Sequence, residues 1–316
     1  MTYQPATRPT LYFIGVSTSK SSIMPVFPAW AQHLRLKDAV IKGIDFPLHA
    51  DPAAYRAAVS FIKQDPLSLG ALVTTHKIDL YAAAKDLFEE TDAYASLMHE
   101  TSCISKRGAK LICHAKDPIS SGLTIDNFLP ADHFARTGAE LFSIGAGGST
   151  IAHTWHLAQK KRGANRPSRI IVADRDRGRL DEIKRIHAAF AIDLPVDYVQ
   201  VADAAGNDAI LAGLKPHALV INATGLGKDA PGSPLTDAAR FPDHAIAWDL
   251  NYRGDLVFLD QARAQAAARH LQIENGWTYF IHGWTQVIAE VFHIDIPTSG
   301  PGFEALSRIA ADAAKG

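Results

Sequence analysis

Residues Glu140-Leu-Phe-Ser-Ile-Gly145-Ala-Gly147-Gly148-Ser-Thr150-Ile-Ala152 join a short apolar run to closely spaced glycines, and a helical pattern follows. This order predicts a strand, a tight turn and a helix. Glycine lets the backbone approach a pyrophosphate closely, and N–H groups at the helix start hold the anion. Because the spacing is G-x-G-G rather than G-x-G-x-x-G, an ordinary glycine-rich turn is the alternative. The residues expected to hold a cofactor here are Gly145, Ala146, Gly147, Gly148, Ser149 and Thr150.

Composition describes a globular protein of ordinary charge. The 316 residues include 32 basic and 33 acidic side chains, so charge gives no reason to expect nucleic acid or an anionic membrane as partner. No apolar run approaches the length of a membrane span, and no N-terminal apolar stretch resembles a signal peptide, so we expect a cytoplasmic protein. The two cysteines suit a reducing compartment, and the 14 histidines lack metal-ligand spacing, so no metal is expected. The expected partner is a small molecule, with a monomer or homodimer as the assembly.

Apolar runs alternate with helical patterns after the glycines. Runs at 169–173, 196–201, 218–222 and 245–249 predict the strands of a doubly wound parallel sheet. The length favours two domains. We expect an α/β protein with a substrate-binding and catalytic domain (1–121 plus 277–316) and a Rossmann-type dinucleotide-binding domain (122–276). The first domain is expected to be discontinuous because the C-terminal helices return to it.

An acidic residue follows the second strand of this sheet. Asp174 ends the apolar run 169–173, and in dinucleotide-binding folds such a carboxylate reads the ribose. It accepts hydrogen bonds from ribose hydroxyls and repels a 2′-phosphate, so NAD is the expected cofactor. Arg175 fits a 2′-phosphate or stacks on adenine, which makes NADP the second choice. A solvated charged turn is the alternative, and it suits Arg177 and Arg179 better than Asp174.

The first third of the chain contains a hydroxyl-rich loop. Residues 11–14 read as a buried strand, and Val16-Ser-Thr-Ser19-Lys-Ser21-Ser22 precedes a helical pattern from Val26 to Leu36. Helix caps explain part of this composition. Loops beyond strand ends in α/β proteins also bind small polar ligands, so both interpretations stay open for Ser19 and Ser21.

Lys77 lies at a junction between a strand and a helix. The run 71–73 ends in Thr74 and Thr75, and a helical pattern begins at Ile78. A cation in the first helical turn opposes the helix dipole, which makes an acid/base role easier. Asp117 precedes Pro118 at the start of another helical pattern. The alternatives are a solvated lysine and a simple helix cap.

The order of these features resembles the shikimate dehydrogenase superfamily, which includes shikimate and quinate dehydrogenases. The resemblance runs from about residue 11 to residue 292. Ile221-Asn222-Ala223-Thr224-Gly225-Leu226-Gly227 resembles the family's N-A-T-P-L-G segment, and Ala247-Trp-Asp249-Leu-Asn-Tyr252 resembles its D-x-x-Y strand end. The resemblance implies that Asn222, Ala223, Thr224, Gly225 and Leu226 bind near the nicotinamide.

The resemblance also implies that Lys77 and Asp117 form the catalytic pair. Lys77 would exchange the substrate hydroxyl proton while hydride moves to or from the nicotinamide, and Asp117 would orient and charge-balance the lysine. Hydride removal from a secondary alcohol does need a positioned base for the O–H proton. The side chains expected to contact substrate are Ser19, Ser21, Thr74, Thr75, Ser105, Tyr252, His282 and Gln286.

Several substrate contacts of the family are replaced. Ser21 matches the first of two serines, but Ile23 and Met24 stand where the family has a second serine and a proline. The family's asparagine aligns with Ile104 or, in a shifted register, with Ser105. Its threonine before the lysine falls on Val73 or is replaced by Thr74. Its glutamine near the C-terminus aligns with Gly283, and Gln286 lies about one helical turn further on.

These replacements argue against shikimate as the substrate, because a site built to bind a hydroxyl discriminates by orders of magnitude. The sequence predicts an NAD(P)-dependent dehydrogenase that oxidises a secondary alcohol of a small polyol or hydroxy acid, or catalyses the reverse. A shikimate- or quinate-like acid, a cyclitol and a sugar-derived acid are the candidates. The alternatives are a non-catalytic NAD(H)-binding sensor or accessory protein and a methylenetetrahydrofolate dehydrogenase-like enzyme.

Overall fold

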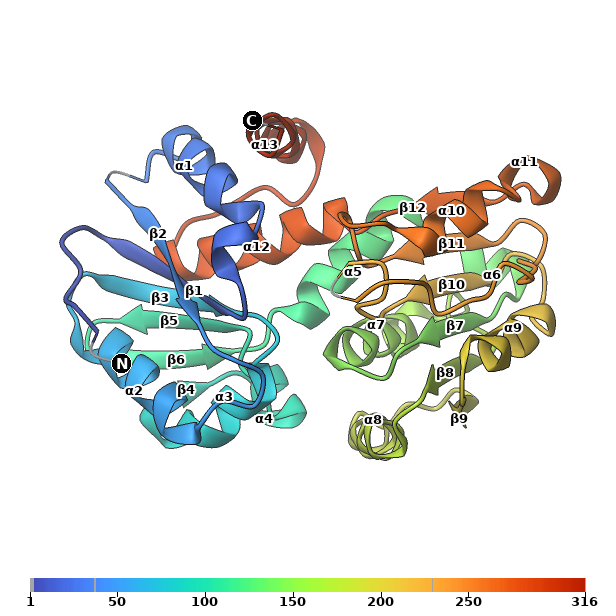
Figure 1. Cartoon of the computed structure of the whole chain (residues 1–316), viewed down its shortest axis with the longest axis horizontal. Coiled ribbons are helices and arrows are strands. Elements are labelled where there is room, and N and C mark those ends of the chain that lie inside the picture. The colour runs from blue at the N-terminus through green and yellow to red at the C-terminus, as the bar shows by residue number, and fades with distance from the viewer. Residues whose placement is uncertain (1–2, 37, 229, 316) are drawn as a thin grey trace. The chain divides into compact units, whose positions relative to one another are not determined.

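The computed structural model describes residues 3–36, 38–228 and 230–315 (Figure 1). The chain divides into two compact units, which are described separately. Unit 1 comprises Met1–Asp117 and Ile281–Gly316, and unit 2 comprises Pro118–Phe280. No helix in the described part of the chain is long and apolar enough to cross a membrane.

Unit 1 is built on a six-stranded mixed sheet with the order β2-β1-β3-β5-β6-β4. Strands β1, β2 and β3 are parallel, β5 runs antiparallel to both β3 and β6, and β4 pairs parallel with β6. All six residues of β1 are buried, as expected for a central strand. The strands are β1 (Thr10–Gly15), β2 (Val40–Asp45), β3 (Ser68–Val73), β4 (Glu90–Thr91), β5 (Cys103–Arg107) and β6 (Lys110–His114).

Helices α1 and α13 lie side by side in unit 1, as do α2 and α3 (Figure 1). The indole of Trp30 on α1 is fully buried and donates to the Leu306 carbonyl of α13 at 2.9 Å. This contact fastens the C-terminal helix to the first α-helix of the chain. The helices are α1 (Ile23–His33), α2 (Pro52–Gln64), α3 (Lys77–Ala84), α4 (Ala93–Met98), α12 (Trp277–Phe292, in this unit from Ile281) and α13 (Gly300–Ala313).

Unit 2 contains a six-stranded sheet with the order β12-β11-β10-β7-β8-β9, and all its pairings are parallel. The first strand of the unit, β7, lies in the middle of the order, which is the doubly wound arrangement. The predicted α/β fold class is therefore confirmed. The strands are β7 (Leu141–Ile144), β8 (Ile170–Asp174), β9 (Val196–Gln200), β10 (Leu219–Asn222), β11 (Ile246–Asp249) and β12 (Gln272–Glu274).

Helices connect most of these strands, although β11 follows β10 with no helix between them. Phe142 and Val220 from the central strands pack with Phe241 and Phe258 in one buried apolar cluster. The helices are α5 (Asp117–Phe128, in this unit from Pro118), α6 (His133–Thr137), α7 (Gly148–Ala158), α8 (Arg177–Ala189), α9 (Ala204–Ala212), α10 (Val257–Arg263) and α11 (Ala266–Arg269).

Helix α12 begins earlier than the sequence pattern predicts. The apolar pattern near the C-terminus predicts a helix from Trp284 to Phe292. The helix starts at Trp277 because the Asn275 carboxamide oxygen accepts from the Trp277 N–H at 2.9 Å. The pattern also gave no sign of β4, α4 or β12. These elements are short, so too few residues repeat for a periodic pattern to register.

Candidate functional site

Lys77 and Asp117 form an ion pair within unit 1. Lys77 is the first residue of α3, immediately beyond the end of β3, and Asp117 is the first residue of α5, beyond the end of β6. Their side chains are 20% and 14% exposed, so both are largely shielded and still reachable. A lysine held in this way can exchange a proton with a hydroxyl while its carboxylate partner fixes its position.

The turn before Lys77 is held tightly. Thr75 adopts a left-handed conformation with a φ of 62°, and the His76 N–H donates to the Thr74 carbonyl at 2.6 Å. The buried imidazole of His76 is fixed by the Tyr55 hydroxyl at 2.9 Å. Burial lowers the pKa of His76, which favours a neutral ring. His76 therefore supports the turn from which Lys77 projects.

A third carboxyl group lies near this ion pair, and sequence reasoning missed it. Glu100 is 2% exposed, and burial raises its pKa to about 7. The charge of Lys77 opposes this rise in the pKa of Glu100, whereas Asp117 and Asp92 add to it. No motif marks Glu100; the only available signal was an acidic residue directly before a buried strand.

The raised pKa of Glu100 predicts a pH-dependent stability. Because the folded chain holds this proton more tightly than the unfolded chain, the stabilising contribution is complete below the ordinary pKa of 4.5 and is lost as pH rises through about 7. Glutamine at this position cannot ionise. Between about pH 4 and about pH 8, we expect the free energy of unfolding of Glu100→Gln to gain about 1–3 kcal/mol relative to the wild type.

Urea denaturation at both pH values measures this difference. Glu90→Gln is the matched control, because the Glu90 carboxylate is exposed and paired with Lys110. A constant difference between Glu100→Gln and the wild type across this range would show that folding does not raise the pKa of Glu100.

The hydroxyl loop lies at the carboxyl ends of β1 and β3. A Cβ placed on Gly15 would lie 3.1 Å from the Thr74 methyl and 3.2 Å from the Thr18 methyl, so these three residues are close neighbours. Thr18 is buried and its hydroxyl donates to Asp45 at 2.6 Å, which anchors the loop. Ser19 is exposed and Ser21 half-buried, whereas Thr18 is a support that the sequence pattern did not single out.

Two of the predicted substrate contacts lie in the interior of unit 1. Ser105 is fully buried, its hydroxyl bonds the His114 ring at 2.9 Å, and it pairs with Gly70 near the start of β3, whereas Lys77 follows the other end. His282 is also fully buried and stacks on Phe303 at a centroid distance of 4.3 Å. Burial lowers the pKa of His282 to about 4. Both side chains therefore serve internal packing.

The remaining predicted contacts are divided between the units. Thr75 is exposed and Gln286, on α12, is half-buried, both in unit 1. Gly283 on the same helix has open space where a Cβ would stand. Tyr252 belongs to unit 2, where its ring packs 4.8 Å from Phe280.

A cavity of about 980 Å³ lies in unit 2 at the carboxyl ends of the parallel strands. Nine of the predicted cofactor residues line it: Gly145, Ala146, Gly147, Asp174, Arg175, Ala223, Thr224, Gly225 and Leu226. The structure thus brings together three loops that are separated in the sequence. The lining residues that sequence reasoning did not assign to a cofactor include Asp176, Arg179, Asp203, Asn207 and Ser233.

The glycine loop approaches the loop after β10 closely. Gly145 has a φ of +105°, a conformation that favours glycine, and a Cβ there would lie 2.9 Å from the Ala223 carbonyl oxygen. Gly147 then caps α7 in an extended conformation, and the helix starts at Gly148. N–H groups at the start of α7 therefore border the loop that lines the cavity, an arrangement that suits a phosphate group.

Asp174 is fastened to the glycine loop. Its carboxylate accepts from the Ala146 N–H at 2.7 Å and from the Asp176 N–H at 2.9 Å. Arg179 also borders this loop, since its guanidinium lies 3.8 Å from the Cβ position of Gly147. The interpretation of Arg179 as part of a solvated turn is incomplete, because this exposed residue lines the cavity.

Thr150 and Asn222, predicted to bind the cofactor, have buried side chains that hold the loops. The Thr150 hydroxyl donates to the Gly145 carbonyl at 2.6 Å. The Asn222 carboxamide accepts from the Thr224 hydroxyl at 2.6 Å and donates to Asp249 at 3.1 Å. Neither residue lines the cavity, so in this structure both hold the loops that do. Gly148 and Ser149, the first residues of α7, are half-buried.

Among the residues that the structure describes, no group of three or more histidine, cysteine or acidic side chains could hold a metal ion. Cys103 and Cys113 are free and buried. Burial raises the pKa of both thiols, which disfavours the reactive thiolate.

Comparison with known proteins finds one protein of similar sequence and several solved structures of similar fold. No family model matches the chain. Shikimate dehydrogenase (NADP(+)) of Lactococcus lactis subsp. cremoris is 28% identical over 189 residues, which are 60% of this chain and 61% of that protein. The match therefore spans less than two thirds of the relative's length.

Two solved structures resemble nearly the whole chain. Quinate dehydrogenase from Corynebacterium glutamicum, solved in complex with NAD, matches with a TM-score of 0.72 and 18% identity, covering 96% of this chain and 99% of that one. The ligand-free 5-ketofructose reductase of a Gluconobacter species matches with a TM-score of 0.66 and 15% identity, covering 97% and 99%. The chain thus has the fold of shikimate and quinate dehydrogenases, and 60% of it resembles a shikimate dehydrogenase in sequence.

Proposed function

We propose that the protein is an NAD(P)-dependent dehydrogenase that interconverts a secondary alcohol and a ketone on a small polyol or hydroxy acid. The observation that carries this proposal is the shielded Lys77–Asp117 ion pair at strand ends of unit 1. The cavity of unit 2, with its glycine loop, supplies the second requirement. Unit 1 then acts as the substrate domain and unit 2 as the cofactor domain.

The cavity of unit 2 fits a dinucleotide. The turn at Gly145 admits no side chain without displacement, so backbone can approach a pyrophosphate there, and the carboxylate of Asp174 lies where a ribose is expected. Bound NAD(P) would supply or accept the hydride. The residues that would hold it are Gly145, Ala146, Gly147, Asp174 and the loop 223–226.

Lys77 carries out the proton step in this proposal. During oxidation the neutral amine accepts the proton of the substrate hydroxyl, and during reduction the ammonium returns a proton to the carbonyl oxygen. Asp117 accepts a hydrogen bond from Lys77, which fixes the direction of the amine and balances its charge once protonated. Asp117 can also accept a hydrogen bond from a neighbouring substrate hydroxyl.

The substrate class follows from the unit 1 residues that differ from the family pattern. Thr74 is half-buried at the end of β3, and its methyl group lies beside Gly15 at the end of β1, so one threonine hydroxyl stands near these strand ends. Gly283 offers open space where the family has a glutamine, so a different substituent is accommodated there. These differences support a polyol or sugar-derived acid over shikimate, and a 5-ketofructose reductase is among the chains of similar fold.

A spectrophotometric screen tests the proposal. Cyclitols, sugar acids, quinate, shikimate and ketosugars are assayed with NAD(H) and NADP(H) at 340 nm, in both directions, as is methylenetetrahydrofolate. Turnover of a polyol or hydroxy acid supports the proposal. Micromolar NADH binding without turnover of any candidate would instead favour a sensor or accessory protein.

Asp174 is expected to set the cofactor preference. Its carboxylate lines the cavity beside Arg175, so a 2′-phosphate placed there meets a negative charge. We expect Asp174→Ala to lose about tenfold or more in affinity for NAD and to gain affinity for NADP. Calorimetric titration with both cofactors measures this; Asp181→Ala, with an exposed carboxylate paired to Arg177, is the control. Unchanged NAD affinity in Asp174→Ala would contradict the assignment.

A further inference from the structure

Glu100 is a buried acid that the proposed proton step does not use. Resting on the proposed function, we propose that Glu100 is a positioning residue for Lys77: beside Asp117, its carboxylate supplies a second negative charge that favours the ammonium form of the lysine. The positive charge of Lys77 would then be balanced by two carboxylates: Asp117, which it contacts, and Glu100, which is buried nearby.

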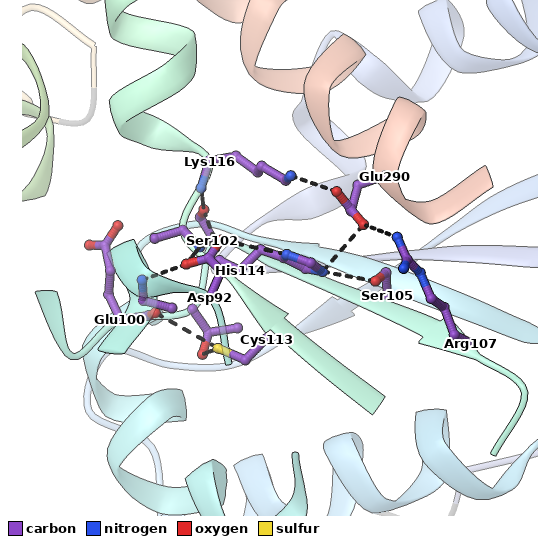
Figure 2. Close-up of polar contacts among 12 residues, drawn as sticks. Asp92, Glu100, Ser102, Ser105, Arg107, Cys113, His114, Lys116 and Glu290 are labelled. Atoms are coloured by element: carbon purple, nitrogen blue, oxygen red, sulfur yellow. Dashed lines mark hydrogen bonds and ion pairs between the residues drawn. The ribbon is translucent and has the colours of Figure 1, made fainter. Parts of the chain in front are cut away.

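The backbone on both sides of the Glu100 side chain is fixed. The N–H of Thr101 donates to the Lys77 carbonyl at 3.1 Å, which ties the residue after Glu100 to the first turn of α3. The Cys113 thiol contacts the Glu100 carbonyl at 3.9 Å, which ties it to β6 (Figure 2). Glu100 therefore cannot move away from Lys77 without breaking contacts on both sides.

The Glu100 carboxyl group is buried and incompletely bonded. Its Oε1 atom has no hydrogen-bond partner in the described part of the chain. Figure 2 shows the carboxyl pointing away from the network in which Lys116 and His114 contact Glu290. A buried carboxylate without full hydrogen bonding is costly, and a nearby cation lowers that cost when the group is ionised.

The charged groups that act on Glu100 come from three elements. Lys77 on α3 is the cation that favours its ionised form, whereas Asp117 at the start of α5 and Asp92 at the cap of α4 oppose ionisation. The same coupling acts in reverse on Lys77. When Glu100 is ionised, the Lys77 ammonium is favoured; when Glu100 is protonated, that support is lost.

The consequence concerns the pH range of the proton step. Reduction needs the Lys77 ammonium as acid, and oxidation needs its amine as base. An ionised Glu100 raises the pKa of Lys77, so the Lys77 ammonium persists to higher pH. Removing the Glu100 charge should therefore move the whole titration of Lys77 toward lower pH, with no bond made or broken by Glu100 itself.

The direct test is the titration of Lys77, which needs neither cofactor nor substrate. Lysines are labelled by reductive ¹³C-methylation, and the Lys77 signal is assigned by its absence in Lys77→Arg. We expect Glu100→Gln to lower the pKa of Lys77 by about 0.5 or more, whereas Glu100→Asp keeps the negative charge and most of the wild-type value. Glu90→Gln, an exposed carboxylate of the same unit, should leave the Lys77 titration unchanged.

The pH dependence of kcat/KM provides the second readout. In Glu100→Gln the acid limb of the oxidation reaction should move to lower pH, whereas a merely structural defect lowers the rate at every pH. A Lys77 pKa within about 0.2 of the wild-type value in Glu100→Gln overturns the inference. Absence of turnover in the wild type would refute the proposed function alone, because the Lys77 titration is read without turnover.

Discussion

Lys77→Ala is expected to lower kcat by about 10³-fold on any substrate that the wild-type protein oxidises. Alanine removes the proposed acid/base group. No side chain is then positioned to accept the hydroxyl proton during oxidation or to protonate the carbonyl oxygen during reduction. Lys77 belongs to unit 1 and the cavity for the dinucleotide to unit 2, so the dissociation constant for NADH should stay within about twofold of the wild-type value. Stopped-flow measurement of hydride transfer and a fluorescence titration with NADH separate the two quantities.

Lys85→Ala is the control for this experiment. Lys85 is an exposed lysine that ends the same helical segment, and it should retain wild-type kcat. The unfolding free energy of Lys77→Ala must also be measured, because the variant leaves Asp117 without its ion-pair partner. A folded Lys77→Ala protein that turns over as fast as Lys85→Ala would exclude Lys77 as the acid/base group.

The fold of unit 2 was predictable from the sequence because its central strands are short, continuous apolar runs between helical patterns. Strand β8 is such a run, with Asp174 at its end, and the glycines after β7 fixed the position of the turn. The sequence predicted that the C-terminal helices belong to the first domain, but not the contacts that hold them there. The contact of Trp30 with Leu306, which secures α13, joins residues 276 positions apart and leaves no local pattern.

The positions of candidate residues that follow strand ends were predictable from the sequence. Which side chains are buried was not. Lys77 and Asp117 follow strand ends, so topology alone places them at one edge of the sheet. Thr150 and Asn222 lie in the right loops, yet their side chains turn inward to hold backbone. Glu100 was invisible because an acidic residue is ordinarily exposed, and only the packing around it reveals its burial.

Gly145→Ala is expected to weaken NADH binding by about 30-fold, which corresponds to about 2 kcal/mol. Two effects combine at this position. The φ of +105° is unfavourable for alanine, and the added Cβ would lie 2.9 Å from the Ala223 carbonyl oxygen, so the loop must shift. Both loops line the cavity, and a displacement of either one moves the backbone that should hold the pyrophosphate.

Gly138→Ala is the control that separates displacement of the glycine loop from the backbone strain that alanine causes at any positive φ. Gly138 also has a positive φ, of 60°, but its Cβ position faces open space and it does not line the cavity. That variant should lose about 1 kcal/mol of unfolding free energy and keep its NADH affinity. Equal NADH affinities in the two variants would show that the close approach of Gly145 to Ala223 does not shape the binding site. A loss confined to Gly145→Ala, measured by calorimetry on a protein that still unfolds cooperatively, would assign the cofactor to the glycine loop independently of any substrate.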